Sequence, residues 1–101
     1  RRAENAIWFH YEDICEGYYS HRDYLALLHN IDHVTLSGIH IQSLDGAKRF
    51  GWLIEVIYDG ECSLTVPDAA ERVGLFAGID IPDHMQLEFR RILSRVHELT
   101  C

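Results

Sequence analysis

The chain has 101 residues, and its 9 lysines and arginines against 16 aspartates and glutamates give a formal net charge of −7 at pH 7. Its 48% apolar and 25% charged residues are typical of one globular domain over 1–101 and argue against a disordered, collagen-like or coiled-coil chain. No stretch approaches the ~20 apolar residues of a membrane-spanning helix, so no membrane partner is predicted.

Two helices are expected at the start of the chain. Apolar residues over 3–18 recur at helical spacing, and only Phe9 falls among the acids of the opposite face. A second helix begins after Ser20, whose hydroxyl can cap it while Asp23 occupies the capping-box position. Asn30 is a suitable stop, because asparagine tolerates the left-handed conformation that ends helices.

Three antiparallel strands are expected next, at roughly 33–44, 47–58 and 61–66. The links between them contain Asp-Gly pairs at 45–46 and 59–60, the composition favoured by two-residue hairpin turns. This spacing predicts a β-meander.

Two helices are expected to close the chain. Hydrophobic-Pro-Asp sequences at 66–68 and 81–83 each begin a capping box, and the final helix over 83–99 has a continuous apolar face. The predicted fold class is therefore α+β, a three-stranded antiparallel meander with helices before and after it in the order ααβββαα.

Both faces of the expected sheet are apolar, although an antiparallel sheet with one solvated face alternates polar and apolar residues. A partner chain, or the chain's own helices, must therefore cover the second face. The residues on that face are the predicted interface: Ile39, Ile41, Phe50, Trp52 and Tyr58.

Glu55 is the candidate ligand-binding residue. The expected register places it on an apolar face between Leu36 and Leu64. A carboxylate there could act as a general acid or base, or anchor a ligand in a pocket under the helices. A buried pair with an arginine or histidine, or a slipped register, is the alternative.

No catalytic residue, cofactor or metal site is predicted. The chain has no serine elbow, no phosphate-binding loop and no dinucleotide fingerprint. His29 and His33 are four apart, but the helix is expected to end between them, and no third ligand has a defined position.

The cysteines favour a reducing compartment, and we expect the cytoplasm. Cys15, Cys62 and Cys101 are odd in number and lack C-x-x-C spacing, so no disulfide framework is indicated. The chain opens with Arg1 and has its only methionine at Met85, which leaves open whether a leader was removed.

Residues 69–75 resemble the Ala-x-x-x-Gly core of a helix-turn-helix. The resemblance implies a DNA-binding regulator that uses 68–99, with Arg90, Arg91 and Arg95 on phosphates. A solvated helix face is the alternative for these arginines.

The leading hypothesis rests on the missing catalytic signature, the uncovered apolar sheet face and the acid-rich segment 55–88. Its eight acids against Arg72 carry the entire net charge, 1 − 8 = −7, which attracts a basic protein and repels nucleic acid. We expect a small acidic, non-enzymatic regulatory module that binds protein, inhibitor-like and homodimeric. A small-ligand-binding or minor enzymatic domain around Glu55 is the alternative, and the DNA-binding regulator is third.

Overall fold

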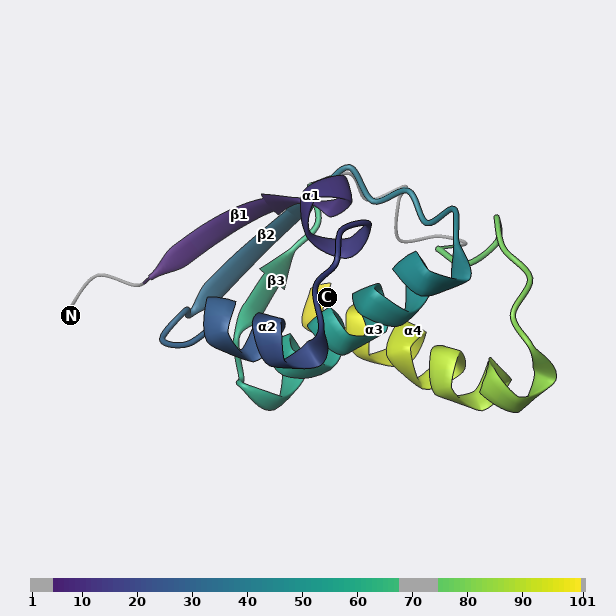
Figure 1. Cartoon of the computed structure of the whole chain (residues 1–101). Helices are drawn as coiled ribbons and strands as arrows, with labels where there is room; N and C mark the ends of the chain where they lie inside the picture. Colours follow the sequence, from purple (N-terminus) through teal and green to yellow (C-terminus); the bar gives the residue numbers. More distant parts are fainter. Residues whose placement is uncertain (1–4, 68–74, 101) are drawn as a thin grey trace.

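The computed structural model describes residues 5–67 and 75–100, which form a three-stranded sheet packed against helices (Figure 1). The elements in chain order are β1 (Ala6–His10), α1 (Tyr11–Cys15), α2 (His21–Leu27), β2 (His33–Ser37), α3 (Leu44–Asp59), β3 (Ser63–Thr65), the 3₁₀ helix η2 (Asp83–Met85) and α4 (Gln86–Thr100).

The sheet is parallel throughout, in the order β1-β2-β3. Ala6 of β1 lies opposite His33 of β2, and His33 lies opposite Ser63 of β3. The expected antiparallel meander in the order ααβββαα is therefore wrong. Parallel neighbours need a long crossover connection, and here helices supply it: α1 and α2 link β1 to β2, and α3 links β2 to β3.

The largest correction concerns 47–58, expected as the middle strand and found inside α3. Ser43 caps this helix, since its hydroxyl accepts a hydrogen bond of 3.0 Å from the Gly46 N–H. The Asp-Gly pair at 45–46 therefore forms the first helical turn instead of a hairpin. Buried side chains follow helical spacing along it, as Phe50, Ile54 and Ile57 show.

The range 3–18, expected as one helix, contains β1 and the short α1. Burial alternates along β1 as expected for a strand, because Ile7 and Phe9 are half-buried while Trp8 between them is 71% exposed. The β-branched and aromatic residues of β1 fit a strand better than a helix interior.

Two expected helices are confirmed. Ser20 and Asp23 form the predicted capping box of α2, and Asn30 adopts a left-handed φ of 64° shortly after that helix ends. The helix expected over 83–99 is found as η2 followed by α4. The helix expected after 66–68 lies outside the described residues.

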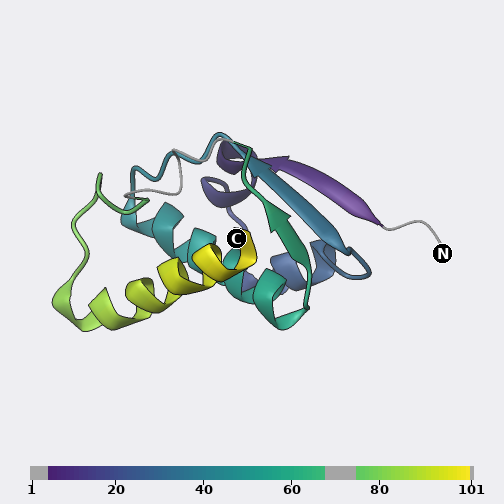
Figure 2. The ribbon, with the colours of Figure 1, turned by 180° about the vertical axis from the view of Figure 1, so that it is seen from behind.

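Topology explains why none of the helices in the described part of the chain lies over one face of the sheet. Crossovers between parallel strands are right-handed, so strands added in one direction place all connecting helices on the same side. Figure 2 shows the three strands from behind, with no helix of residues 5–67 and 75–100 in front of them. The core lies between the sheet's other face and the helices.

Aromatic rings run through this core from α1 to α4. Tyr11 and Phe50 have ring centroids 6.3 Å apart, Phe50 and Phe76 are 6.1 Å apart, and Phe76 and Phe89 are 4.9 Å apart. These contacts fix α3 and α4 against one another and so position the groove between them.

Candidate functional site

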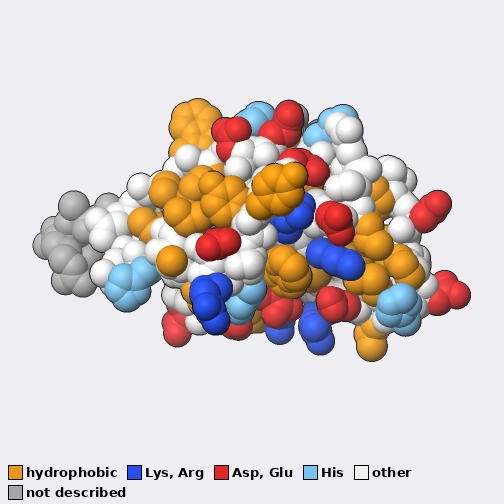
Figure 3. All heavy atoms as spheres, viewed as in Figure 1, with side chains coloured by type: hydrophobic (Ala, Val, Ile, Leu, Met, Phe, Trp, Pro, Cys, Tyr) orange, Lys and Arg blue, Asp and Glu red, His pale blue; other side chains and the backbone are white. Residues whose placement is uncertain are grey.

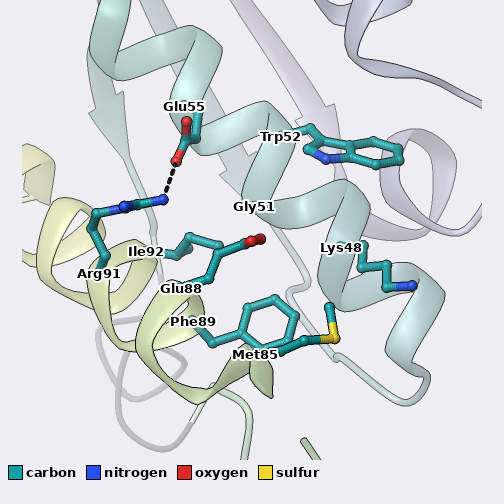
Figure 4. Close-up of a pocket in the computed structure, with 9 residues that line it drawn as sticks. All are labelled: Lys48, Gly51, Trp52, Glu55, Met85, Glu88, Phe89, Arg91 and Ile92. Carbon is teal, nitrogen blue, oxygen red and sulfur yellow. Dashed lines mark ion pairs between the residues drawn. The ribbon is translucent and has the colours of Figure 1, made fainter. Parts of the chain in front are cut away.

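A groove of about 420 Å³ lies between α3 and α4 and is the candidate site (Figure 4). Its floor is apolar, because Gly51 of α3 meets the buried Phe89 and Ile92 of α4. A volume of this order suits a small molecule or an inserted side chain. The remaining lining side chains come from both helices and the turn before α4: Lys48, Trp52, Glu55, Met85, Glu88 and Arg91.

Glu55 faces α4 across this groove. Its Oε1 accepts a hydrogen bond of 2.8 Å from Arg95 Nη1 and lies 3.9 Å from Arg91 Nη2. Its side chain is 31% exposed, so the expected position on an apolar sheet face between Leu36 and Leu64 is wrong. Glu55 instead forms an ion pair with an arginine, which is the alternative interpretation given for it above. A ligand role for Glu55 stays a prediction.

Arg95 joins the two helices through more than one contact. Besides its bond to Glu55, its guanidinium carbon lies 4.8 Å from the centroid of the Tyr58 ring. Glu98, hydrogen-bonded to the Tyr58 hydroxyl and negatively charged beside it, raises the pKa of Tyr58. Arg95 of α4 therefore contacts two side chains of α3, Glu55 and Tyr58.

Glu88 differs from Glu55 in having no ion-pair partner among residues 5–67 and 75–100. Its carboxylate extends from α4 toward α3 in the groove (Figure 4), and no other described side chain forms an ion pair or hydrogen bond with it. Trp52, 40% exposed, forms the wall on the α3 side. The charged side chains that line the groove are balanced, because Lys48 and Arg91 accompany the carboxylates of Glu55 and Glu88.

A second, shallower hollow of about 280 Å³ adjoins the groove and shares Lys48 and Trp52 with it. Tyr18, Tyr19 and Arg49 also line it. Figure 3 shows hydrophobic and cationic side chains next to one another on this face of the molecule.

The five predicted interface residues are not on one surface. Ile39, Ile41 and Phe50 are buried in the core, whereas Trp52 and Tyr58 are exposed on α3. An interface role for these residues stays a prediction, but the shared sheet face that motivated it does not exist.

Cys15 lies in the core next to the capped start of α2. Burial raises the pKa of Cys15 to about 12, so the thiol stays protonated at neutral pH and is a poor nucleophile. Burial also raises the pKa of Tyr24, whose hydroxyl donates a 2.7 Å hydrogen bond to the Ile14 carbonyl.

The described histidines are dispersed. His33 Nε2 lies 2.9 Å from the Thr65 hydroxyl, and His40 Nδ1 lies 3.0 Å from the Gln42 amide. Over 5–67 and 75–100, no three histidine, cysteine or acidic side chains are placed to hold a metal ion.

Sequence reasoning missed Lys48, Met85 and Glu88. A signal was present, because Lys48, Trp52 and Glu55 follow i, i+4, i+7 spacing on α3. This spacing places side chains on one face only in a helix, so it could not be recognised while 47–58 was interpreted as a strand.

None of the helices in 5–67 and 75–100 combines the length and the apolar character needed to cross a bilayer.

Comparison with known proteins gives a family match. The model of the family described as AFG1-like ATPase matches residues 1–101, the whole of the chain. No curated protein matches the chain, and no solved structure does.

This match overturns the expected function. The non-enzymatic, inhibitor-like regulatory module is wrong because the matching family consists of ATPases. The match does not test a ligand-binding or minor enzymatic pocket around Glu55, and it gives no support to the DNA-binding regulator over 68–99. The misleading step was to treat the lack of a catalytic signature in 1–101 as evidence about activity.

Proposed function

Because the chain belongs to the AFG1-like ATPase family, we propose that the protein takes part in ATP hydrolysis. The observation that carries this proposal is the family match, which covers residues 1–101.

The architecture supports an ATPase-related function. Parallel strands joined by helical crossovers form the α/β arrangement on which many nucleotide-binding proteins are built. In such sheets ligands bind beyond the carboxyl ends of the strands. Here His10 and Ser37 end β1 and β2, and Gly38 follows directly.

Residues 1–101 contain no G-x-x-x-x-G-K-[ST] sequence, the loop that cradles nucleotide phosphates in P-loop enzymes. We therefore assign no phosphate-binding loop to these residues. The role proposed for them is to contribute an α/β unit to the ATPase.

The test is release of inorganic phosphate from Mg²⁺-ATP by the protein expressed from its complete gene. We expect phosphate release that follows the protein peak through size-exclusion chromatography and stops when Mg²⁺ is chelated. Activity that separates from the protein peak, or its absence from correctly folded protein, would contradict the proposal.

Two other expectations continue as proposals. A cytoplasmic location is supported by the free, buried thiols of Cys15 and Cys62. We also propose that the protein forms a homodimer, so light scattering should give twice the mass of the chain. A monomeric mass at all protein concentrations would contradict the homodimer.

A further inference from the structure

We propose that the open edge of β1 pairs with β1 of a second copy of the chain, in antiparallel orientation about a two-fold axis at Trp8. The two three-stranded sheets then form one continuous sheet. This pairing specifies the surface of the homodimer proposed above, and it does not depend on ATP hydrolysis.

β1 is the outermost strand of the sheet and presents backbone groups to its outer edge (Figure 1 and Figure 2). The Asn5 carbonyl accepts a hydrogen bond of 3.2 Å from the His33 N–H, so the peptide groups of Asn5 face β2. Peptide groups alternate in direction along a strand, and those of Ala6, Trp8 and His10 therefore face away from β2. No strand of residues 5–67 and 75–100 pairs with them on that side.

The sequence of β1 lacks the features that keep edge strands from pairing. Its five residues, Ala-Ile-Trp-Phe-His, include no proline, lysine, arginine, aspartate or glutamate. The Trp8 indole leaves the edge accessible, because its Nε1 donates a 2.8 Å hydrogen bond to Ser37 Oγ and the ring is thereby held toward β2. An added strand can therefore reach the backbone of β1.

A second copy fits this edge because β1 is self-complementary about Trp8. Antiparallel pairing centred there places Trp8 opposite its counterpart, and it places Ile7 opposite Phe9 of the second copy. It also places Ala6 opposite His10, so the outward peptide groups meet one another as a hydrogen-bonded ladder requires. Ile7 and Phe9 are only half-buried, and each gains an apolar neighbour on the core side of the sheet.

The other sheet edge is a poorer partner for β1. β3 has only three residues, Ser63–Thr65, and joining β1 of one copy to β3 of the next generates an open chain of copies. Pairing of β1 with β1 closes on itself and gives a dimer. It also places no two charged side chains opposite one another, although each copy has a net charge of −7.

The first test is sedimentation equilibrium of the full chain from about 5 to about 200 µM, because pairing of one short strand gives a small interface and a weak dimer. We expect the wild type to approach twice the mass of the chain as its concentration rises. Trp8→Pro removes the outward N–H at the centre of the pairing and leaves the bonds to β2 in place. Trp8→Ala, the matched control, removes the same indole and keeps that N–H. Trp8→Ala should associate at least about tenfold more tightly than Trp8→Pro, the scale of two lost hydrogen bonds.

A charge-swap experiment tests the two-fold axis, and Trp8 suits it because its side chain is 71% exposed. Trp8→Lys and Trp8→Glu each place like charges opposite one another in their own dimers, whereas a mixture of the two places lysine opposite glutamate. The mixture should associate about threefold more tightly than either variant alone at low ionic strength. Trp52→Lys mixed with Trp52→Glu is the control on exposed α3 surface and should show no such preference. Circular dichroism establishes that each variant is folded.

The outcomes separate the homodimer from its surface. A wild type that stays monomeric would overturn the homodimer and the β1 pairing together. A dimer that Trp8→Pro leaves as tight as Trp8→Ala, or an equal preference in the Trp8 and Trp52 mixtures, would overturn the β1 pairing alone. A mass that rises beyond two chains would show an open assembly and would overturn the closed pairing.

Discussion

At the residue scale, Gly38 combines two obstacles to a side chain. Its φ is +66°, in the left-handed region, and a Cβ built on it would overlap the imidazole of His10. A larger residue at position 38 would therefore strain the backbone and would also overlap the His10 side chain at the end of β1. Glycine avoids both costs in the turn that follows β2.

Gly38→Ala should lower the free energy of unfolding by about 1–3 kcal/mol, measured by urea denaturation. His10→Ala removes the ring but leaves the φ unchanged, so Gly38→Ala should cost less in that background. An equal cost in both backgrounds would show that the His10 contact contributes nothing.

At the element scale, Gly51 sets how closely α3 approaches α4. A Cβ at this position would lie 2.5 Å from Ile92 Cδ1, although alanine is intrinsically a better helix former than glycine by ~1 kcal/mol. Close packing and helix propensity thus act in opposite directions at one residue. The same contact forms the floor of the groove.

A double-mutant cycle separates these effects. Ile92→Val deletes the Cδ1 atom, so Gly51→Ala should be more favourable in that background than in the wild type by about 1 kcal/mol. Thermal or urea unfolding of the four proteins gives the coupling energy. Additive changes would show that α3 and α4 do not touch tightly at Gly51.

Local signals made some elements predictable and left others hidden. The Ser20–Asp23 cap of α2 and the apolar face of α4 depend on residues a few positions apart, so they can be read from the chain. The nature of 47–58 was ambiguous, because two Asp-Gly pairs favour hairpins while the Ser43 cap and the spacing of buried residues favour a helix. The incorrect prediction of antiparallel strands followed from the interpretation of 47–58 as a strand.

The candidate site was only partly predictable for a related reason. Glu55 and Trp52 stand out as a carboxylate and an aromatic ring in an apolar segment. Their partners Arg95 and Glu88 lie on a different helix, and only tertiary packing brings the two helices together. No local pattern specifies that packing.

At the scale of the whole molecule, one buried thiol and two buried tyrosine hydroxyls make the free energy of unfolding depend on pH in the alkaline range. Burial raises the pKa of Cys15 to about 12 from 9.0, and it also raises the pKa values of Tyr11 and Tyr24 above 10.0. The unfolded chain therefore loses these protons at a lower pH than the folded chain.

The free energy of unfolding should be independent of these groups below about pH 9 and should fall as the pH rises from 9 toward 12. Urea titrations across this range, with phenolate absorbance as the ionisation probe, measure the fall. Cys15→Ala should make the decline less steep near its onset. A flat stability over the range would contradict the burial of these groups.

The strand order β1-β2-β3 has a consequence for how the chain folds during synthesis. β2 and β3 each leave the ribosome after the strand that they join, so each is added to an existing edge and neither must be inserted between two others. β1 has no partner until β2 is made, because Ala6 pairs with His33. The sheet can therefore grow in one direction, from first strand to last, as translation proceeds.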